Sequence, residues 1–127
     1  MSDPTAAPQV QVVFCTAPAH GERGKPGARE LAERLVQEQL CACVSLLPQV
    51  TSIYRWDGKV EQAAETLLMI KTMRPRVAAL RQRLLELHPY AVPEFLVLDV
   101  ADGLPAYLQW VAESTQAGST EAGKGPA

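Results

Sequence analysis

Three side chains of metal-binding type, Cys15, His88 and Glu94, lie at or close to the ends of expected secondary-structure elements. Cys15 follows the β-branched and apolar run 10–14, and His88 ends an apolar helical pattern in front of a proline. Imidazole nitrogen suits Cu²⁺ and thiolate suits softer, reduced copper, so Cys15 and His88 could together hold copper or another divalent cation. Glu94 could add a carboxylate.

Each of these residues also has a purely structural explanation. A cysteine beside a β-strand is often a small buried hydrophobe, and a histidine at a helix C-terminus interacts favourably with the helix dipole. Glu94 has basic residues available as ion-pair partners. The residue types alone leave both explanations open for Cys15 and His88, and they favour the ion pair for Glu94.

Two further groups of residues could carry chemistry. Alternation along a strand puts Cys41 and Cys43 on the same face, where two thiols could coordinate a soft metal ion. Their apolar neighbours favour packing in the core instead. The loop 20–27, HGERGKPG, has glycines and two basic residues in front of an expected helix. Pro26 stands where a phosphate-binding loop has Ser or Thr, so we expect an ordinary loop, whose role the sequence leaves open.

The elements that position these residues centre on a long hairpin over residues 41–72. Asp57-Gly58 lies between two extended segments of about fifteen residues each, and this dipeptide favours a type I′ turn. Counting outward from the turn pairs Trp56 with Lys59, Tyr54 with Glu61 and, without a bulge, Leu46 with Met69. Pro48 cannot donate to the ladder, so we expect a bend there.

The tip of this hairpin is too long for one small subunit to cover. Its aromatic and basic side chains are typical of interface cores, and we assign them to contacts between subunits: Tyr54, Arg55, Trp56 and Lys59. Tyr90 and Trp110 are interpreted as packing residues.

The order of expected elements is β-α-β-β-α-β with an extra C-terminal helix. This order predicts an α+β, ferredoxin-like domain over 10–115, with an antiparallel sheet covered by two helices on one face. The other face carries apolar residues, so oligomerisation is its simplest cover. We expect disorder in 1–9 and 116–127, which are rich in Pro, Ala, Gly and Ser.

Composition narrows the function classes. The formal net charge of the 127 residues is −2, which offers no general attraction for nucleic acid or anionic lipid. No apolar run reaches the roughly twenty residues of a membrane span, and the N-terminus lacks a signal-peptide pattern. We therefore expect a cytoplasmic protein with reduced thiols. An RNA-recognition module shares the element order, but Phe14 is the only aromatic on the two expected central strands, which excludes base stacking there.

Several separate motifs in the same order resemble the CutA family of divalent-cation tolerance proteins. They are VFCTAP at 13–18, LCACV at 40–44, VTSIYRW at 50–56 with GK at 58–59, IKT at 70–72, HPY at 88–90 with VPE at 92–94, and YLQW at 107–110. The likeness covers residues 10–115. Two departures are the glycine-rich loop 20–27 and Leu87, which stands where some relatives have a second histidine.

The resemblance implies a homotrimer of ferredoxin-like subunits, similar in architecture to the PII signalling trimers. It also implies binding of copper or another divalent cation, at positions that match Cys15 and His88. We expect no enzymatic activity. The alternative that it suggests is a PII-like sensor that binds a small anionic ligand at subunit interfaces, in clefts where Lys71 and Arg74 could meet that ligand.

Overall fold

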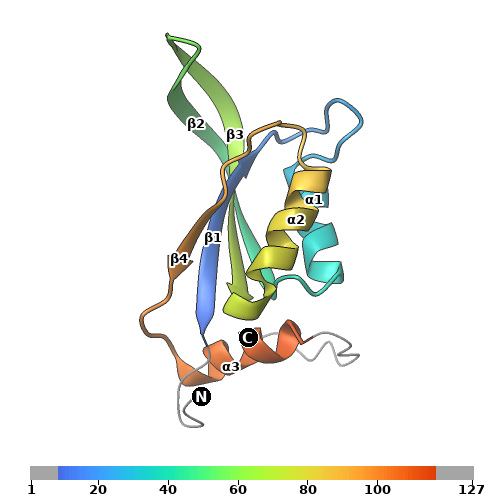
Figure 1. Cartoon of the computed structure of the whole chain (residues 1–127), viewed down its shortest axis with the longest axis vertical. Coiled ribbons are helices and arrows are strands. Elements are labelled where there is room, and N and C mark those ends of the chain that lie inside the picture. Colours follow the sequence, from blue (N-terminus) through green and yellow to red (C-terminus); the bar gives the residue numbers. More distant parts are fainter. Residues whose placement is uncertain (1–8, 117–127) are drawn as a thin grey trace.

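The computed structural model describes residues 9–116 as one α+β unit (Figure 1). Its elements are β1 (Val10–Ala17), α1 (Ala28–Gln37), β2 (Cys43–Trp56), β3 (Lys59–Met73), a 3₁₀ turn (Arg74–Arg76), α2 (Val77–Leu87), β4 (Leu96–Asp99) and α3 (Pro105–Ser114). The four strands form one sheet in the order β2-β3-β1-β4, and every neighbouring pair is antiparallel. This topology confirms the ferredoxin-like prediction. The expected disordered ends, 1–9 and 116–127, lie outside the described residues except at their inner limits.

Helices α1 and α2 cover one face of the sheet. Their buried stripes follow the period of 3.6, with Leu31 and Leu35 from α1 and Leu80 and Leu84 from α2 fully buried. They pack on alternate residues of the two central strands, chiefly Val13, Cys15, Leu68 and Ile70. The apolar periodicity of the sequence therefore places Cys15 inside the main core.

Helix α3 closes the opposite end of the sheet from the hairpin tip (Figure 1). Leu108 and Val111 of α3 form a second, smaller cluster with Val10 and Ala42. The helix begins at Pro105, whose fixed φ suits a first helical turn.

The β2–β3 hairpin extends past the helices, as the length of its arms predicted (Figure 1). Asp57 and Gly58 have φ of 52° and 75°, so both turn residues are left-handed, as a type I′ turn requires. The predicted pairs Trp56–Lys59 and Tyr54–Glu61 are confirmed. Leu46 pairs with Leu68 and not with Met69, because a bulge between residues 47 and 50 shifts the register at Pro48.

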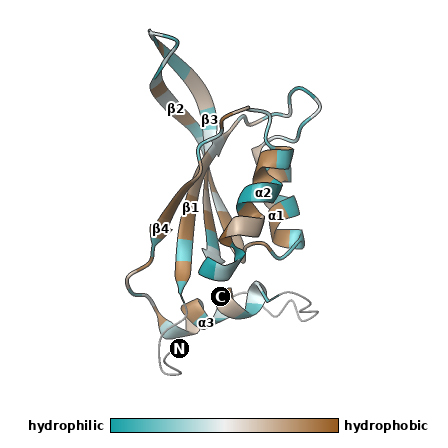
Figure 2. Cartoon of the chain, in the orientation of Figure 1, coloured by the Kyte–Doolittle hydropathy of each residue, from teal (hydrophilic) through white to brown (hydrophobic). Residues whose placement is uncertain are grey.

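The sheet face turned away from α1 and α2, which we call the open face, is largely apolar. Figure 2 shows long hydrophobic segments along β1 and β4. The half-buried or exposed apolar side chains assigned to this face by strand alternation are Val12, Phe14, Leu47, Leu67, Met69, Leu96 and Leu98. In the described chain no helix covers them.

Two short segments connect the longer elements. The strand β4 covers only Leu96–Asp99. The 3₁₀ turn Arg74–Arg76, which contains Pro75, lies between β3 and α2, and α2 begins at Val77.

Candidate functional site

The two principal metal-ligand candidates meet at one backbone oxygen, the carbonyl of Thr16. The His88 ring contacts this oxygen through Nε2 at 2.8 Å, and the Cys15 thiol lies 3.6 Å from it. Cys15 comes from β1 inside the core, and His88 is the residue at which α2 ends. Strand and helix thus bring together the cysteine and histidine that the sequence singled out.

His88 uses both of its ring nitrogens. The backbone N–H of Tyr90 donates to Nδ1 at 3.0 Å, so Nε2 carries the proton and donates to Thr16. The residue is 3% exposed. Burial lowers the pKa of His88 below 6.5. The hydrogen bond to Thr16 and the charge of Glu65 favour the protonated ring, but their effect on the pKa is smaller than that of burial. The imidazole is therefore neutral at neutral pH, and in this conformation neither nitrogen has a lone pair free for a metal.

The Cys15 thiol is protonated as well. Cys15 is fully buried, and burial, followed by the charges of Glu94 and Glu65, raises the pKa of its thiol to about 12. Metal coordination by Cys15 would have to displace this proton.

Glu94 is on the surface, and the described residues give it no ion pair. Partial burial and the charge of Glu65 raise the pKa of the Glu94 carboxyl. Within residues 9–116, no three Cys, His, Asp or Glu side chains lie close enough together to hold a metal ion. One subunit thus brings Cys15 and His88 together without completing a set of three ligands with Glu94.

A hydrogen-bonded chain continues from His88 to Glu65. The Tyr90 ring lies beside the His88 ring, with centroids 4.7 Å apart, and its hydroxyl donates to the Glu65 carboxylate at 2.9 Å. Burial, and then the acceptor Glu65, raise the pKa of the Tyr90 hydroxyl. Tyr90 is therefore a polar link in this site, whereas the sequence suggested only packing.

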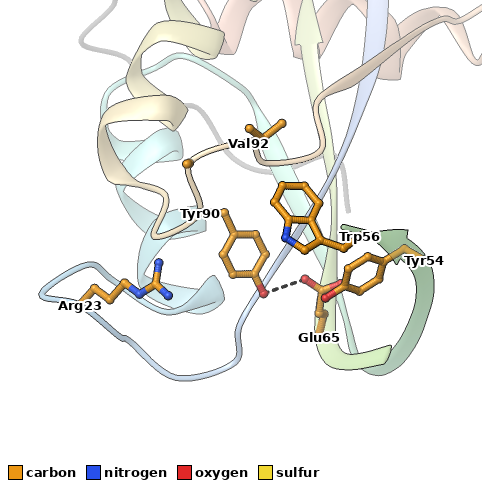
Figure 3. A pocket seen from close by; sticks show the side chains of 7 residues that line it. Arg23, Tyr54, Trp56, Glu65, Tyr90 and Val92 are labelled. Carbon is orange, nitrogen blue, oxygen red and sulfur yellow. Dashed lines mark hydrogen bonds between the residues drawn. The ribbon is translucent and has the colours of Figure 1, made fainter. Parts of the chain in front are cut away.

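Next to Tyr90 is a pocket of about 480 Å³ (Figure 3). Tyr54 and Trp56 reach it from β2, and Glu65 from β3. Arg23, Tyr90 and Val92 come from the loops after β1 and α2. The hairpin thus forms one wall of a cavity within the subunit, a role that its sequence did not reveal.

The glycine-rich loop that carries Arg23 folds back on itself. Glu22 and Lys25 exchange backbone hydrogen bonds of 2.9 and 3.2 Å, and the Lys25 ammonium donates to the Glu86 carbonyl at the end of α2. Gly21 precedes this turn, Gly24 lies inside it with φ of 74°, and Gly27 precedes α1. The Lys25 side chain thus ties the loop to α2.

The remaining candidates are dispersed. Cys41 is buried in the main core, whereas Cys43 begins β2 and accepts a hydrogen bond from Lys71 at 3.9 Å, so the prediction that both thiols share a face is wrong. All three cysteines are thiols.

The two basic residues proposed for a small-ligand cleft have different partners. Lys71 also donates to the Ser45 hydroxyl. Arg74 pairs with Asp99 at 3.3 Å, so Lys71 and Arg74 have separate polar partners.

The four hairpin-tip residues assigned to subunit contacts are all exposed in the single subunit: Tyr54, Arg55, Trp56 and Lys59. Trp56 is 62% exposed, which is unusual for so large an apolar ring.

Sequence reasoning missed the part that three residues play in the site. Thr16 contributes only its backbone carbonyl, which no side-chain pattern reveals. Glu65 was passed over in the second arm of the hairpin, yet it is 6% exposed there, and a carboxylate is seldom buried without a function or a partner. Tyr90 follows His88 and Pro89 directly, and this proximity was the available signal.

The fold and the site define a class of protein: a small ferredoxin-like α+β subunit with a projecting hairpin, an uncovered apolar face and no phosphate-binding loop of the Walker type in its described part. In the described chain, no helix is both long and apolar enough to cross a membrane.

Known proteins narrow this class to a family. The family model described as "CutA1 divalent ion tolerance protein" matches residues 11–114, and the chain belongs to this family. The divalent-cation tolerance protein CutA of Thermus thermophilus is 43% identical over 83% of this chain and 97% of its own length. Mouse protein CutA is 43% identical over 84% of this chain, which spans only 58% of the mouse protein.

Solved structures agree with the fold. The Thermus thermophilus structure superposes with a TM-score of 0.76 over 84% of this chain and 99% of its own, at 43% identity. A structure described as the PII-like protein CutA from Nostoc, in its apo form, gives a TM-score of 0.74 at 38% identity over 84% of this chain and 97% of its own. The structural neighbours therefore include a protein described as PII-like.

Proposed function

We propose that the protein is a non-enzymatic homotrimer that binds copper or another divalent cation and acts in metal-ion tolerance in the cytoplasm. Membership of the divalent ion tolerance family supports the cation. The observation that carries the site is the Thr16 carbonyl, which contacts both the Cys15 thiol and the His88 ring. Thiolate and imidazole are ligands that copper prefers, and Glu94, on the surface nearby, is the proposed third donor.

Binding at this site requires the two side chains to give up their present contacts. A metal on Nε2 of His88 replaces the bond to Thr16 and moves the ring proton to Nδ1, which ends the contact with the Tyr90 N–H. A metal on Cys15 displaces the thiol proton. Binding should therefore release protons, strengthen with rising pH and rearrange residues 88–90.

Anaerobic calorimetric titration with Cu²⁺ tests this site. Cys15→Ala and His88→Ala should each weaken binding by about tenfold or more, because each removes one of the few ligands. Cys41→Ala is the matched control, since Cys41 is equally buried and burial likewise raises the pKa of its thiol to about 12. Unchanged affinity in both site variants would contradict the proposal.

Two features support the proposed trimer: the open face and the hairpin. Seven half-buried or exposed apolar side chains on the open face are not covered by a helix of the described chain, and an area of this kind is typical of an interface. The hairpin over residues 50–65 projects beyond its own helices, so its tip can reach a neighbouring subunit and pair with an exposed sheet edge. Tyr54, Arg55, Trp56 and Lys59 would then make the contacts.

A second candidate function is a PII-like sensor for a small anionic ligand between subunits. Lys71 favours it: its ammonium is half-buried on the open face and has no acidic partner within ion-pair distance in residues 9–116. Arg74 is the second proposed contact, and it would have to exchange Asp99 for the ligand. Thermal-shift screening with nucleotides and organic acids tests this function, and no rise in melting temperature with any of them would count against it.

A further inference from the structure

The pocket beside Tyr90 has the composition of an aromatic cage (Figure 3). Tyr54 and Trp56 are two residues apart on β2, so both project from the same side of the strand. Tyr90 supplies a third ring from the loop after α2. Rings of this kind attract an ammonium group through their negative faces, and Trp and Tyr do so most strongly.

A carboxylate stands in this aromatic wall. Glu65 is 6% exposed and lines the pocket. One of its oxygens accepts the Tyr90 hydroxyl, and the described residues provide neither a hydrogen-bond donor for the other oxygen nor a basic group within 4 Å. Glu65 is thus a little-exposed carboxylate at the pocket wall with no cation beside it, which favours a positively charged ligand in the pocket.

The opposite side of the pocket carries a positive charge. Arg23 extends toward Tyr90, which stands between it and Glu65 in Figure 3. No side-chain hydrogen bond or ion pair of Arg23 occurs within residues 9–116. A guanidinium in this position is suited to a carboxylate, which it can hold through two parallel hydrogen bonds.

The pocket does not suit a bare metal ion. Glu65 is its only carboxylate, and none of its walls carries a histidine or cysteine side chain. Divalent cations need several oxygen, nitrogen or sulfur ligands. The volume of about 480 Å³ is that of a small-molecule site.

We propose that this pocket binds a small zwitterion, with its ammonium group among the rings of Tyr54, Trp56 and Tyr90 beside Glu65, and its carboxylate at Arg23. The charge separation of the pocket then matches that of the ligand. A methylated ammonium fits best, because it carries positive charge on an apolar surface that the rings can cover. This site uses neither Cys15 nor the His88 nitrogens, so it can be tested in the metal-free protein. It shares Tyr90 with the segment 88–90 that metal binding at His88 would rearrange.

Glycine betaine is the probe. Two compounds of similar shape each lack one of its two charges, so the contribution of each charge can be tested separately. In 3,3-dimethylbutanoate a carbon replaces the nitrogen and removes the positive charge, and choline lacks the carboxylate. Titrations of the full chain in its native oligomeric state, followed by calorimetry, should give saturable binding of betaine and affinity weaker by about tenfold for 3,3-dimethylbutanoate. Equal affinity for these two compounds, or no binding of betaine, would overturn the proposal.

Two substitutions assign the ends of the ligand. Glu65→Gln keeps an acceptor for the Tyr90 hydroxyl and removes the charge, and it should weaken betaine binding by about tenfold. Arg23→Gln should weaken betaine binding by a similar factor and leave choline binding unchanged. Glu61→Gln is the matched control, because Glu61 is an exposed carboxylate on the same strand outside the pocket. Full betaine affinity in Glu65→Gln would overturn the assignment of the ammonium end.

Fluorescence gives an independent readout of the ring contact. The chain has two tryptophans, and Trp110 belongs to α3, so in a Trp110→Phe background the emission comes from Trp56 alone. Betaine should change this emission with the same saturation curve as calorimetry. A crystal structure in which a neighbouring subunit fills the pocket, together with unchanged emission, would contradict the site.

Discussion

At the residue scale, the hydrogen bonds of His88 fix both its position and its protonation state. Its ring donates to Thr16 and accepts from the Tyr90 N–H, so the neutral form satisfies both neighbours. The protonated ring would leave the Tyr90 N–H facing another donor. Protonation would therefore keep the contact of the ring with Thr16 of β1 and break its contact with the loop after α2.

This arrangement predicts a loss of stability at mildly acidic pH. The folded-state pKa of His88 is lowered, so as the pH falls below 6.5 the unfolded chain binds a proton that the native ring does not bind. The free energy of unfolding should therefore decrease as the pH falls from about 7 to 5.5, and this histidine should add no pH dependence above about 7.5.

Urea unfolding at a series of pH values measures this effect. The variant His88→Gln cannot titrate in this range, so its stability should fall less than that of the parent chain between pH 7 and about 5.5. The exposed His20 is the only other histidine, and His20→Gln should keep the parent's profile. If His88→Gln and the parent show the same profile, the explanation is wrong.

At the element scale, the loop between β1 and α1 depends on a close backbone approach at Gly27. A β-carbon built at Gly27 would lie 2.4 Å from the Ala19 carbonyl oxygen and 3.0 Å from the Gly21 nitrogen. Both are backbone atoms, which cannot turn aside as a side chain can. The first turn of α1 is held at the same place by the Ala28 N–H, which donates to the Pro18 carbonyl at 2.9 Å.

Gly27→Ala should therefore lower the free energy of unfolding by about 2 kcal/mol or more, because the loop and the start of α1 must move apart. Gly103→Ala is the matched control. Its added carbon would meet the end of the Leu108 side chain at 3.1 Å, which can shift, so the loss should stay below about 1 kcal/mol. Thermal or urea unfolding of the two variants gives the comparison, and similar losses would contradict the predicted close approach.

The sequence revealed the elements better than the contacts between them. Asp57-Gly58 fixed the hairpin turn and its register as far as Tyr54–Glu61, because both depend on local backbone conformation. The helices followed from apolar periodicity, since one face of each packs on the sheet. Beyond Pro48 the register could not be fixed, because the size of a bulge depends on the neighbouring strands.

The site was predictable only in part, because local features can be recognised in the sequence and tertiary contacts cannot. Cys15 and His88 are of metal-binding type and stand at element ends, so they could be selected from the sequence. Their common partner is a backbone carbonyl, and Glu65 and Tyr90 join the site only through tertiary contacts. Such contacts leave no periodic signal in the sequence.

At the scale of the whole molecule, burial is uneven between the two faces of the sheet. The face toward α1 and α2 holds the fully buried Val13, Leu68 and Ile70, whereas the open face keeps several apolar side chains only partly buried. A trimer that covers the open face would remove this difference. The hairpin tip would then be the second contact, since it extends beyond its own subunit.

Phe14→Glu tests this assembly at the centre of the open face. Phe14 is on β1 opposite Met69 and Leu96, so in the proposed trimer a carboxylate there would be buried among apolar side chains. The variant should elute as a monomer in size-exclusion chromatography with light scattering, while the parent chain gives the mass of three chains. Leu85→Glu is the matched control, because Leu85 is an exposed leucine, 50% accessible, on α2, away from the open face. A trimeric Phe14→Glu protein, or loss of the trimer in both variants, would show that the open face is not the interface.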